Sequence, residues 1–149
     1  MAEKNTQHGI TTYTIKSTDG ASQMTFLPER GGSASSLIMP TKNGAKELLF
    51  QHDFFWHEDW HDLPGGWPFL FPVCARLERN GQRGVYLYDG KQYTLKIHGF
   101  SWFMPWDVVA HTDDSITLRL QASDETLRDY PFHFEILLHY HMFALHNAM

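Results

Sequence analysis

The segment HEDWH, residues 57–61, places two histidines four positions apart, with a glutamate directly after the first. On an α-helix this spacing brings both imidazole rings to one face, where they can hold a zinc ion while the glutamate activates a water molecule. The first chemistry that these residue types indicate is therefore metal-assisted hydrolysis, provided that the segment forms a helix.

The residues around HEDWH disfavour that helix. Pro64 biases the residue before it towards extended backbone, and residues 65–66 are both glycine. Residues 53–56 are rich in aromatic side chains without an amphipathic stripe, and a helix of one or two turns is marginal on its own. Ten histidines in 149 residues also make a chance match more frequent. We therefore predict a solvated loop with aromatic anchors, adventitious nickel or zinc binding at most, and no catalytic metal site.

A second set of polar residues lies further along the chain. Arg76 ends the segment PFLFPVCAR, and His98 opens the tripeptide HGF after a strand-like segment. A histidine can exchange a proton near neutral pH, and a guanidinium group can donate several hydrogen bonds to a polar ligand. Each residue alone is more typical of a structural position. The two residues alone therefore do not assign a site.

The elements that must position these residues are strands, because the hydrophobic pattern repeats every two residues. Strand patterns occur at residues 10–16, 22–28, 34–40, 47–50, 85–97, 106–111, 115–122 and 132–142. Four histidines alternate with other residues on the later strands and are predicted to lie on the sheet surface: His111, His133, His139 and His141.

Turn signals divide these strands. Asp89 and Gly90 both tolerate the positive φ of a type I′ turn, so residues 85–97 are predicted to form a hairpin. Residues 113–114, both aspartate, mark a second hairpin. Ser123 is a good N-cap for one helical turn that must end before Pro131.

The chain is thus predicted to have nine or ten strands, no long helix and the fold class of an all-β antiparallel sandwich, as a single domain over residues 1–149. The strand pattern dissolves in FALHNAM, residues 143–149, without a turn that returns to the sheet. We expect an open sheet edge at that point.

The composition excludes several classes of partner. The formal net charge is −5, and no cluster of lysine and arginine could bind nucleic acid or an anionic membrane. The single cysteine, Cys74, excludes an internal disulfide, which fits a reducing compartment. The first residues have no apolar signal segment, and no apolar run approaches membrane-spanning length. We expect a soluble, cytoplasmic protein.

An ordered set of motifs resembles the aldose 1-epimerase (galactose mutarotase-like) family, in particular its bacterial branch with an HGF motif. The motifs are GGSASSL at 31–37, PFLFP at 68–72 followed by Arg76 and Leu77, GKQYTLKIHGF at 90–100, and ET with YPFHF at 125–134. Each is weak alone, but their order and spacing over nearly the whole chain are fairly specific.

The resemblance implies a fold and an activity. The fold would be the first half of a β-supersandwich. The activity would be interconversion of the α and β anomers of an aldohexose, in which a base removes the C1 hydroxyl proton while an acid protonates the ring oxygen. The implied partner is an aldohexose or a related sugar, and no cofactor or metal is required.

Site residues follow by position in the motifs. The resemblance makes Arg76 a substrate-binding arginine and His98 the catalytic histidine that holds the sugar near C1 and the ring oxygen. Phe100 and Trp67 would be walls of the sugar site. The arginine that commonly follows HGF in the family is absent here, where the sequence reads SWFMPW.

Family members are about twice as long as this chain, a length that single all-β domains do reach. The family's second histidine, its sugar-binding aspartate and its general-base glutamate belong to the half that has no counterpart here. Two functions of different class follow. The chain is either an isomerase-family protein whose activity depends on parts supplied elsewhere or lost, or a non-catalytic sugar-binding or interaction remnant. We expect the isolated half-sandwich to associate with itself or aggregate.

Overall fold

The structure is a computed structural model, and it describes residues 3–57 and 65–144. Its larger sheet has five antiparallel strands in the order of the sequence. They are β1 (Glu3–Gln7), β2 (Ile10–Lys16), β3 (Gln23–Leu27), β4 (Ser33–Thr41) and β5 (Gly44–Glu47). Two-residue turns join β1 to β2 and β4 to β5, and longer connections join the others. His8 and Gly9, between β1 and β2, both have positive φ.

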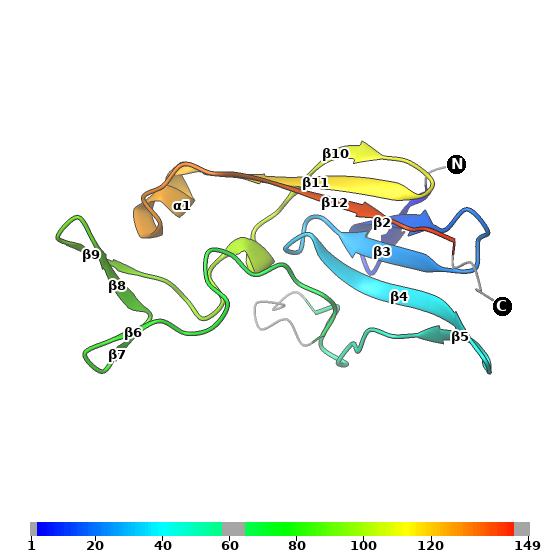
Figure 1. The fold of residues 1–149 in the computed structure, drawn as a ribbon, viewed down its shortest axis with the longest axis horizontal. Helices are drawn as coiled ribbons and strands as arrows, with labels where there is room; N and C mark the ends of the chain where they lie inside the picture. Colours follow the sequence, from blue (N-terminus) through cyan, green and yellow to red (C-terminus); the bar gives the residue numbers. More distant parts are fainter. Residues whose placement is uncertain (1–2, 58–64, 145–149) are drawn as a thin grey trace.

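A second sheet lies over the first, as Figure 1 shows. It contains three antiparallel strands in sequence order: β10 (Asp107–His111), β11 (Ser115–Gln121) and β12 (Glu135–His141). Alternate residues of β11 are buried against the larger sheet, which is the pattern expected of a strand with one apolar face. The antiparallel β-sandwich predicted from the sequence is confirmed.

The core lies between the two sheets. Ile15 and Phe26 of the larger sheet and Ile116 and Leu118 of the smaller one are all completely buried. The ring of Tyr140 packs on Phe26, with 4.7 Å between the ring centroids. Burial raises the pKa of the Tyr140 hydroxyl. Each large apolar side chain buried in this way contributes ~1.5–3 kcal/mol to folding.

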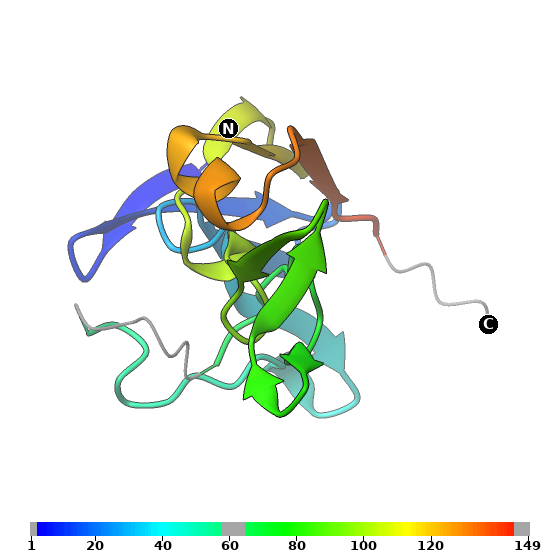
Figure 2. The ribbon, with the colours of Figure 1, turned by 90° about the vertical axis from the view of Figure 1, so that its left-hand side faces the viewer.

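Two small hairpins extend from one end of the sandwich (Figure 1), and Figure 2 looks from that end. They are formed by β6 (Glu78–Arg79) with β7 (Gln82–Arg83), and by β8 (Val85–Tyr88) with β9 (Lys91–Thr94). The second hairpin turns at Asp89 and Gly90, with φ of 50° and 72°, so the type I′ turn is confirmed.

The helix α1 (Asp124–Asp129) lies beside these hairpins. Ser123 is its N-cap, since its side chain accepts a hydrogen bond from the backbone N–H of Thr126, as predicted. Within the described ranges, no helix is long and apolar enough to cross a membrane.

Three predictions about strands were wrong in detail. The described residues contain twelve strands, because β1 and the β6–β7 hairpin add to those expected. The strand predicted at 47–50 instead occupies Gly44–Glu47. The last strand begins at Glu135 and not at Phe132, because the Phe132 ring packs on Tyr88 and Tyr130 instead of joining the ladder.

The turn that carries HGF is tied to the PFLFP segment by one carbonyl group. The oxygen of Phe71 accepts hydrogen bonds from the backbone N–H groups of Phe100 (2.9 Å) and Ser101 (3.2 Å). Gly99 lies directly against this carbonyl, so that a Cβ atom at position 99 would be 2.2 Å from the oxygen. No real Cβ tolerates that approach, so glycine is required for the two segments to meet.

The pair Gly99→Ala and Gly90→Ala tests this contact. Both glycines have φ near 75°, so each alanine pays a similar cost for positive φ, but a Cβ at position 90 meets no atom within 4 Å. We expect Gly99→Ala to lower the free energy of unfolding by ~1–3 kcal/mol more than Gly90→Ala, the usual cost of overpacking. Urea denaturation measures both. Equal midpoints for the two variants would show that the close approach is not needed.

Candidate functional site

His98 occupies the third position of a β-turn. The backbone N–H of Gly99 donates to the carbonyl of Lys96 (3.0 Å), and His98 has φ of 65°. Glycine is the usual residue where such a turn requires positive φ, and an L-residue there costs about 1–2 kcal/mol. Such backbone strain occurs at many functional sites, and His8, Asn80 and Asp89 have a similar φ in hairpin turns of this chain.

The same turn brings His98 next to Arg76 along the backbone. The N–H of His98 donates to the carbonyl of Ala75, at 3.0 Å. Ala75 itself has φ of 146°, a second position where the backbone is held in an unusual conformation. Arg76 follows directly and is exposed, whereas His98 is half-buried. The structure therefore places two of the predicted site residues on adjoining segments.

The imidazole of His98 has an unmet hydrogen-bonding capacity. Its Nδ1 atom is buried, and no group in the described part of the chain forms a hydrogen bond with it. A buried polar atom without a partner costs about 1–3 kcal/mol. Because such atoms are rare in folded proteins, this nitrogen is a candidate for a contact with a bound molecule or with another polypeptide segment.

Phe100 is only 6% exposed and belongs to an aromatic cluster. Its ring packs on those of Phe71, Tyr130 and Phe134, with centroid distances of 5.8, 6.1 and 5.8 Å. Phe100 also lines a cavity of about 310 Å³, which Lys96, Phe103, Glu125 and Asp129 border as well. The predicted role of Phe100 as a wall of the sugar site stays a prediction.

Trp67 lies at the start of the segment that leads to Arg76. It is 54% exposed, and its backbone exchanges two hydrogen bonds with Ala34 of β4, at 2.8 and 3.2 Å. Further along, the Ser101 hydroxyl donates to the carbonyl of Phe69 (2.6 Å). Residues 67–71 are thus held between the larger sheet and the turn of His98, and the Trp67 ring faces solvent, as a platform for a ligand would.

Sequence reasoning missed two residues of this region. Ser101 is completely buried and bridges two segments, because the N–H of the Trp106 indole also donates to its carbonyl, at 2.9 Å. Trp102 has a buried indole N–H with no hydrogen-bond acceptor among the described residues. Neither position carries a signal in the sequence, since both roles depend on contacts made in the folded chain.

Tyr86 of β8 connects the second hairpin to α1. The hydroxyl of Tyr86 donates to the carbonyl of Asp129 (2.7 Å). Burial, together with the neighbouring Tyr93, Tyr130 and Asp129, raises the pKa of Tyr86 to about 12. This hydroxyl therefore stays protonated near neutral pH and acts as a hydrogen-bond donor.

The HEDWH segment lies largely outside the described residues, which stop at His57 and resume at residue 65. His57 is exposed, and its ring makes an edge contact with Phe54, at 5.0 Å. Among residues 3–57 and 65–144, no group of three or more histidine, cysteine, aspartate or glutamate side chains is arranged to hold a metal ion.

The four histidines predicted to lie on the sheet surface differ in exposure and in position relative to the strands. His139 and His141 are exposed on β12, as predicted. His111 is half-buried, and its Nε2 lies 3.2 Å from the carbonyl of Thr14 in the larger sheet. His133 is exposed but precedes β12, so its prediction as a strand residue was wrong.

Comparison with known proteins gives a consistent result. A family model described as aldose 1-epimerase matches residues 12–144. The solved structure of the Slr1438 protein of Synechocystis superposes with a TM-score of 0.76 at 29% identity, over 88% of this chain and 44% of that one. A galactose mutarotase related enzyme from Lactobacillus acidophilus gives a TM-score of 0.70 at 29% identity, over 88% of this chain and 39% of its own.

A galactose mutarotase-like protein from Lactobacillus casei shares the fold, with a TM-score of 0.69 at 24% identity, over 87% of this chain and 39% of its own. No curated protein sequence matches the chain. The chain spans less than half the length of these solved structures, in keeping with a resemblance to the N-terminal half. Since the family model covers nearly all of the chain, this protein belongs to the aldose 1-epimerase family.

Proposed function

We propose that this chain provides the part of a mutarotase site that holds an aldohexose near C1, and that the complete site interconverts the two anomers. The observation that carries the proposal is the turn at His98. It holds a histidine with a buried, unpartnered Nδ1 in a strained conformation, among described residues that place Arg76 beside it.

The proposed reaction needs two proton transfers and no redox step. A base takes the proton of the C1 hydroxyl while an acid gives a proton to the ring oxygen, and the bond between C1 and the ring oxygen breaks. The open-chain aldehyde rotates about the C1–C2 bond. The former ring oxygen, now a hydroxyl, then attacks the other face of C1 and returns its proton to the conjugate base of the acid. The protonated base gives its proton back to the oxygen on C1, which restores the hydroxyl group.

Within this scheme the residues of the chain bind and orient the sugar. His98 would form a hydrogen bond near C1 and the ring oxygen, and the Arg76 guanidinium would donate to neighbouring hydroxyl groups. The exposed ring of Trp67 would pack against the apolar C–H face of the sugar. Phe100, whose ring packs on Phe71, would support the turn of His98 and form a wall of the site. No residue of this chain is assigned as the general base.

A second candidate function is non-catalytic sugar binding. In that case His98, Arg76 and Trp67 would recognise a sugar without assisting ring opening.

The optical rotation of freshly dissolved α-D-galactose or α-D-glucose distinguishes the two candidates. For the mutarotase, we expect the chain to accelerate the change in rotation above the buffer rate and His98→Ala to abolish that acceleration. His133→Ala, which changes an exposed histidine elsewhere, should leave the rate unchanged. Sugar binding by NMR without acceleration would support the second candidate, and neither binding nor acceleration would contradict both.

Arg76 is tested by its effect on affinity. A hydrogen bond to a charged donor contributes about 1.5–3 kcal/mol, so Arg76→Ala should weaken sugar binding about tenfold or more. Arg79→Ala is the matched control, because Arg79 is an exposed arginine three residues away on β6. NMR titration with galactose measures both, and equal affinities for the two variants would remove Arg76 from the site.

We also expect the isolated chain to associate with itself. In the described part of the chain β12 pairs only with β11, which leaves its other edge open, and Leu137 and Phe143 are 57% and 70% exposed. Sedimentation velocity should show a dimer or larger species. A monomer that melts in one sharp transition would contradict this expectation.

A further inference from the structure

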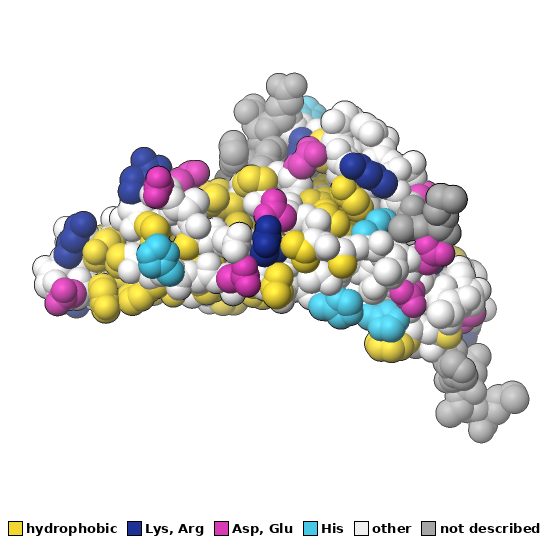
Figure 3. Space-filling view, turned by 90° about the horizontal axis from the view of Figure 1, so that it is seen from above, with side chains coloured by type: hydrophobic (Ala, Val, Ile, Leu, Met, Phe, Trp, Pro, Cys, Tyr) yellow, Lys and Arg dark blue, Asp and Glu magenta, His cyan; other side chains and the backbone are white. Residues whose placement is uncertain are grey.

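The outer face of the smaller sheet carries a pair of histidines that the proposed sugar site does not use. Burial along β12 alternates, so every second residue points away from the core. His139 and His141 are two residues apart and both are exposed, with 6.4 Å between their ring centroids. Figure 3 looks onto this face and shows histidine side chains next to each other near one end of it.

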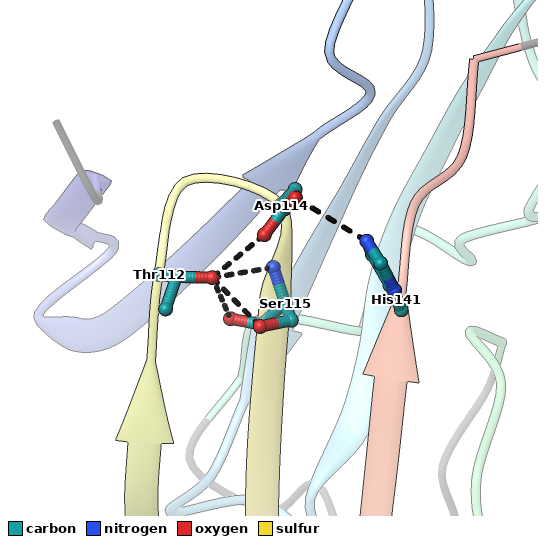
Figure 4. Close-up of polar contacts among 4 residues, drawn as sticks. All are labelled: Thr112, Asp114, Ser115 and His141. Atoms are coloured by element: carbon teal, nitrogen blue, oxygen red, sulfur yellow. Dashed lines mark hydrogen bonds and ion pairs between the residues drawn. The ribbon is translucent and has the colours of Figure 1, made fainter.

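Each of these rings is oriented through one of its nitrogens. Nδ1 of His139 lies 2.8 Å from the hydroxyl oxygen of Thr117, its partner across the β11–β12 ladder. Nε2 of His141 lies 3.2 Å from the Asp114 carboxylate, as Figure 4 shows. The nitrogens left for a ligand are therefore Nε2 of His139 and Nδ1 of His141.

Asp114, which contacts the His141 ring, is itself held by hydrogen bonds. The Thr112 hydroxyl donates to the second carboxylate oxygen of Asp114 (2.8 Å) and also accepts from the backbone N–H of Ser115 (3.0 Å), so the turn between β10 and β11 is closed around it (Figure 4). A histidine that binds a metal usually donates its other N–H to a carboxylate or a similar acceptor, which fixes the ring and raises its basicity. Thr117 and Asp114 occupy this supporting position.

We propose that His139 and His141 form a surface site for one divalent transition-metal ion, with water in the remaining coordination positions. Imidazole nitrogens favour Cu²⁺, Ni²⁺ and Zn²⁺, whereas Mg²⁺ and Ca²⁺ prefer oxygen ligands. The site offers two protein ligands, since the described residues contain no larger metal-binding group. It is independent of the proposed sugar chemistry and lies on a different face of β12 from the core.

The pairing of the strands explains why two ligands can suffice. Both imidazoles come from one strand that is paired along its length with β11, so the spacing of their Cα atoms is set before the metal binds. The contacts with Thr117 and Asp114 orient the two rings. A preformed pair loses less conformational entropy than two histidines on a mobile segment, which favours chelation over binding to a lone histidine.

Calorimetric titration with Ni²⁺ tests the site in a buffer that does not bind metal. The chain should first carry His57→Gln and His61→Gln, which remove binding at the HEDWH segment. We expect one ion per chain, and His139→Gln or His141→Gln should weaken binding about tenfold or more. His133→Gln is the control and should have no effect. Cu²⁺ should bind more tightly than Ni²⁺, and Mg²⁺ should not bind.

NMR spectra of the histidine ring nitrogens locate the ion directly. On addition of Zn²⁺ the signals of Nε2 of His139 and Nδ1 of His141 should shift, and the other histidines should not. The proposal is overturned if His139→Gln and His141→Gln bind Ni²⁺ as tightly as the background chain, if His133→Gln weakens binding equally, or if only millimolar metal binds. Circular dichroism confirms that each variant is folded, which is expected because all three histidines are exposed.

Discussion

The approach of Gly99 to the carbonyl of Phe71 is the constraint on which the candidate site depends. The Phe71 oxygen accepts two backbone hydrogen bonds, from Phe100 and Ser101, and only a residue without a Cβ fits against this carbonyl at position 99. This contact joins two segments that are almost thirty residues apart in the sequence. Beside it, the backbone N–H of His98 donates to the carbonyl of Ala75, so the predicted histidine and arginine lie on adjoining segments.

The rest of the fold keeps that contact in place. The rings of Phe71 and Phe100 pack with Tyr130, which follows α1, and with Phe134, which precedes β12. The aromatic cluster therefore connects the turn of His98 to the smaller sheet, while the Trp67–Ala34 pairing connects the PFLFP segment to the larger one. The sandwich core and the candidate site share these side chains. A substitution that alters the packing of the core should therefore also alter the geometry of the site.

Much of the fold could be predicted from the sequence because its signals are local. The Asp89–Gly90 turn and the Ser123 cap depend on the backbone preferences of one or two residues, and both are confirmed. Asn80 and Gly81, with φ of 50° and 77°, form the turn of the β6–β7 hairpin. Asn-Gly is an equally strong turn signal, so this hairpin, which was missed, could also have been predicted from the sequence. The predicted start of β12 was wrong, because the tertiary packing of Phe132 overrides its strand propensity.

The site was less predictable than the fold. Arg76, His98, Phe100 and Trp67 were predicted as site residues through a resemblance of motifs. The family match supports that resemblance, and the roles of the four residues stay predictions. The burial of Ser101, the unpartnered indole of Trp102 and the left-handed conformation of His98 arise from contacts between distant segments. No periodicity or spacing in one sequence records such contacts.

The central claim is that the strained turn holds His98 as a sugar ligand beside Arg76. A crystal structure of this chain soaked with D-galactose tests it most directly. We expect a sugar oxygen within about 3 Å of a His98 ring nitrogen, the usual length of such a hydrogen bond, and a second hydroxyl group in contact with Arg76. A sugar bound in the cavity beside Glu125 and Asp129, with His98 and Arg76 untouched, would contradict it.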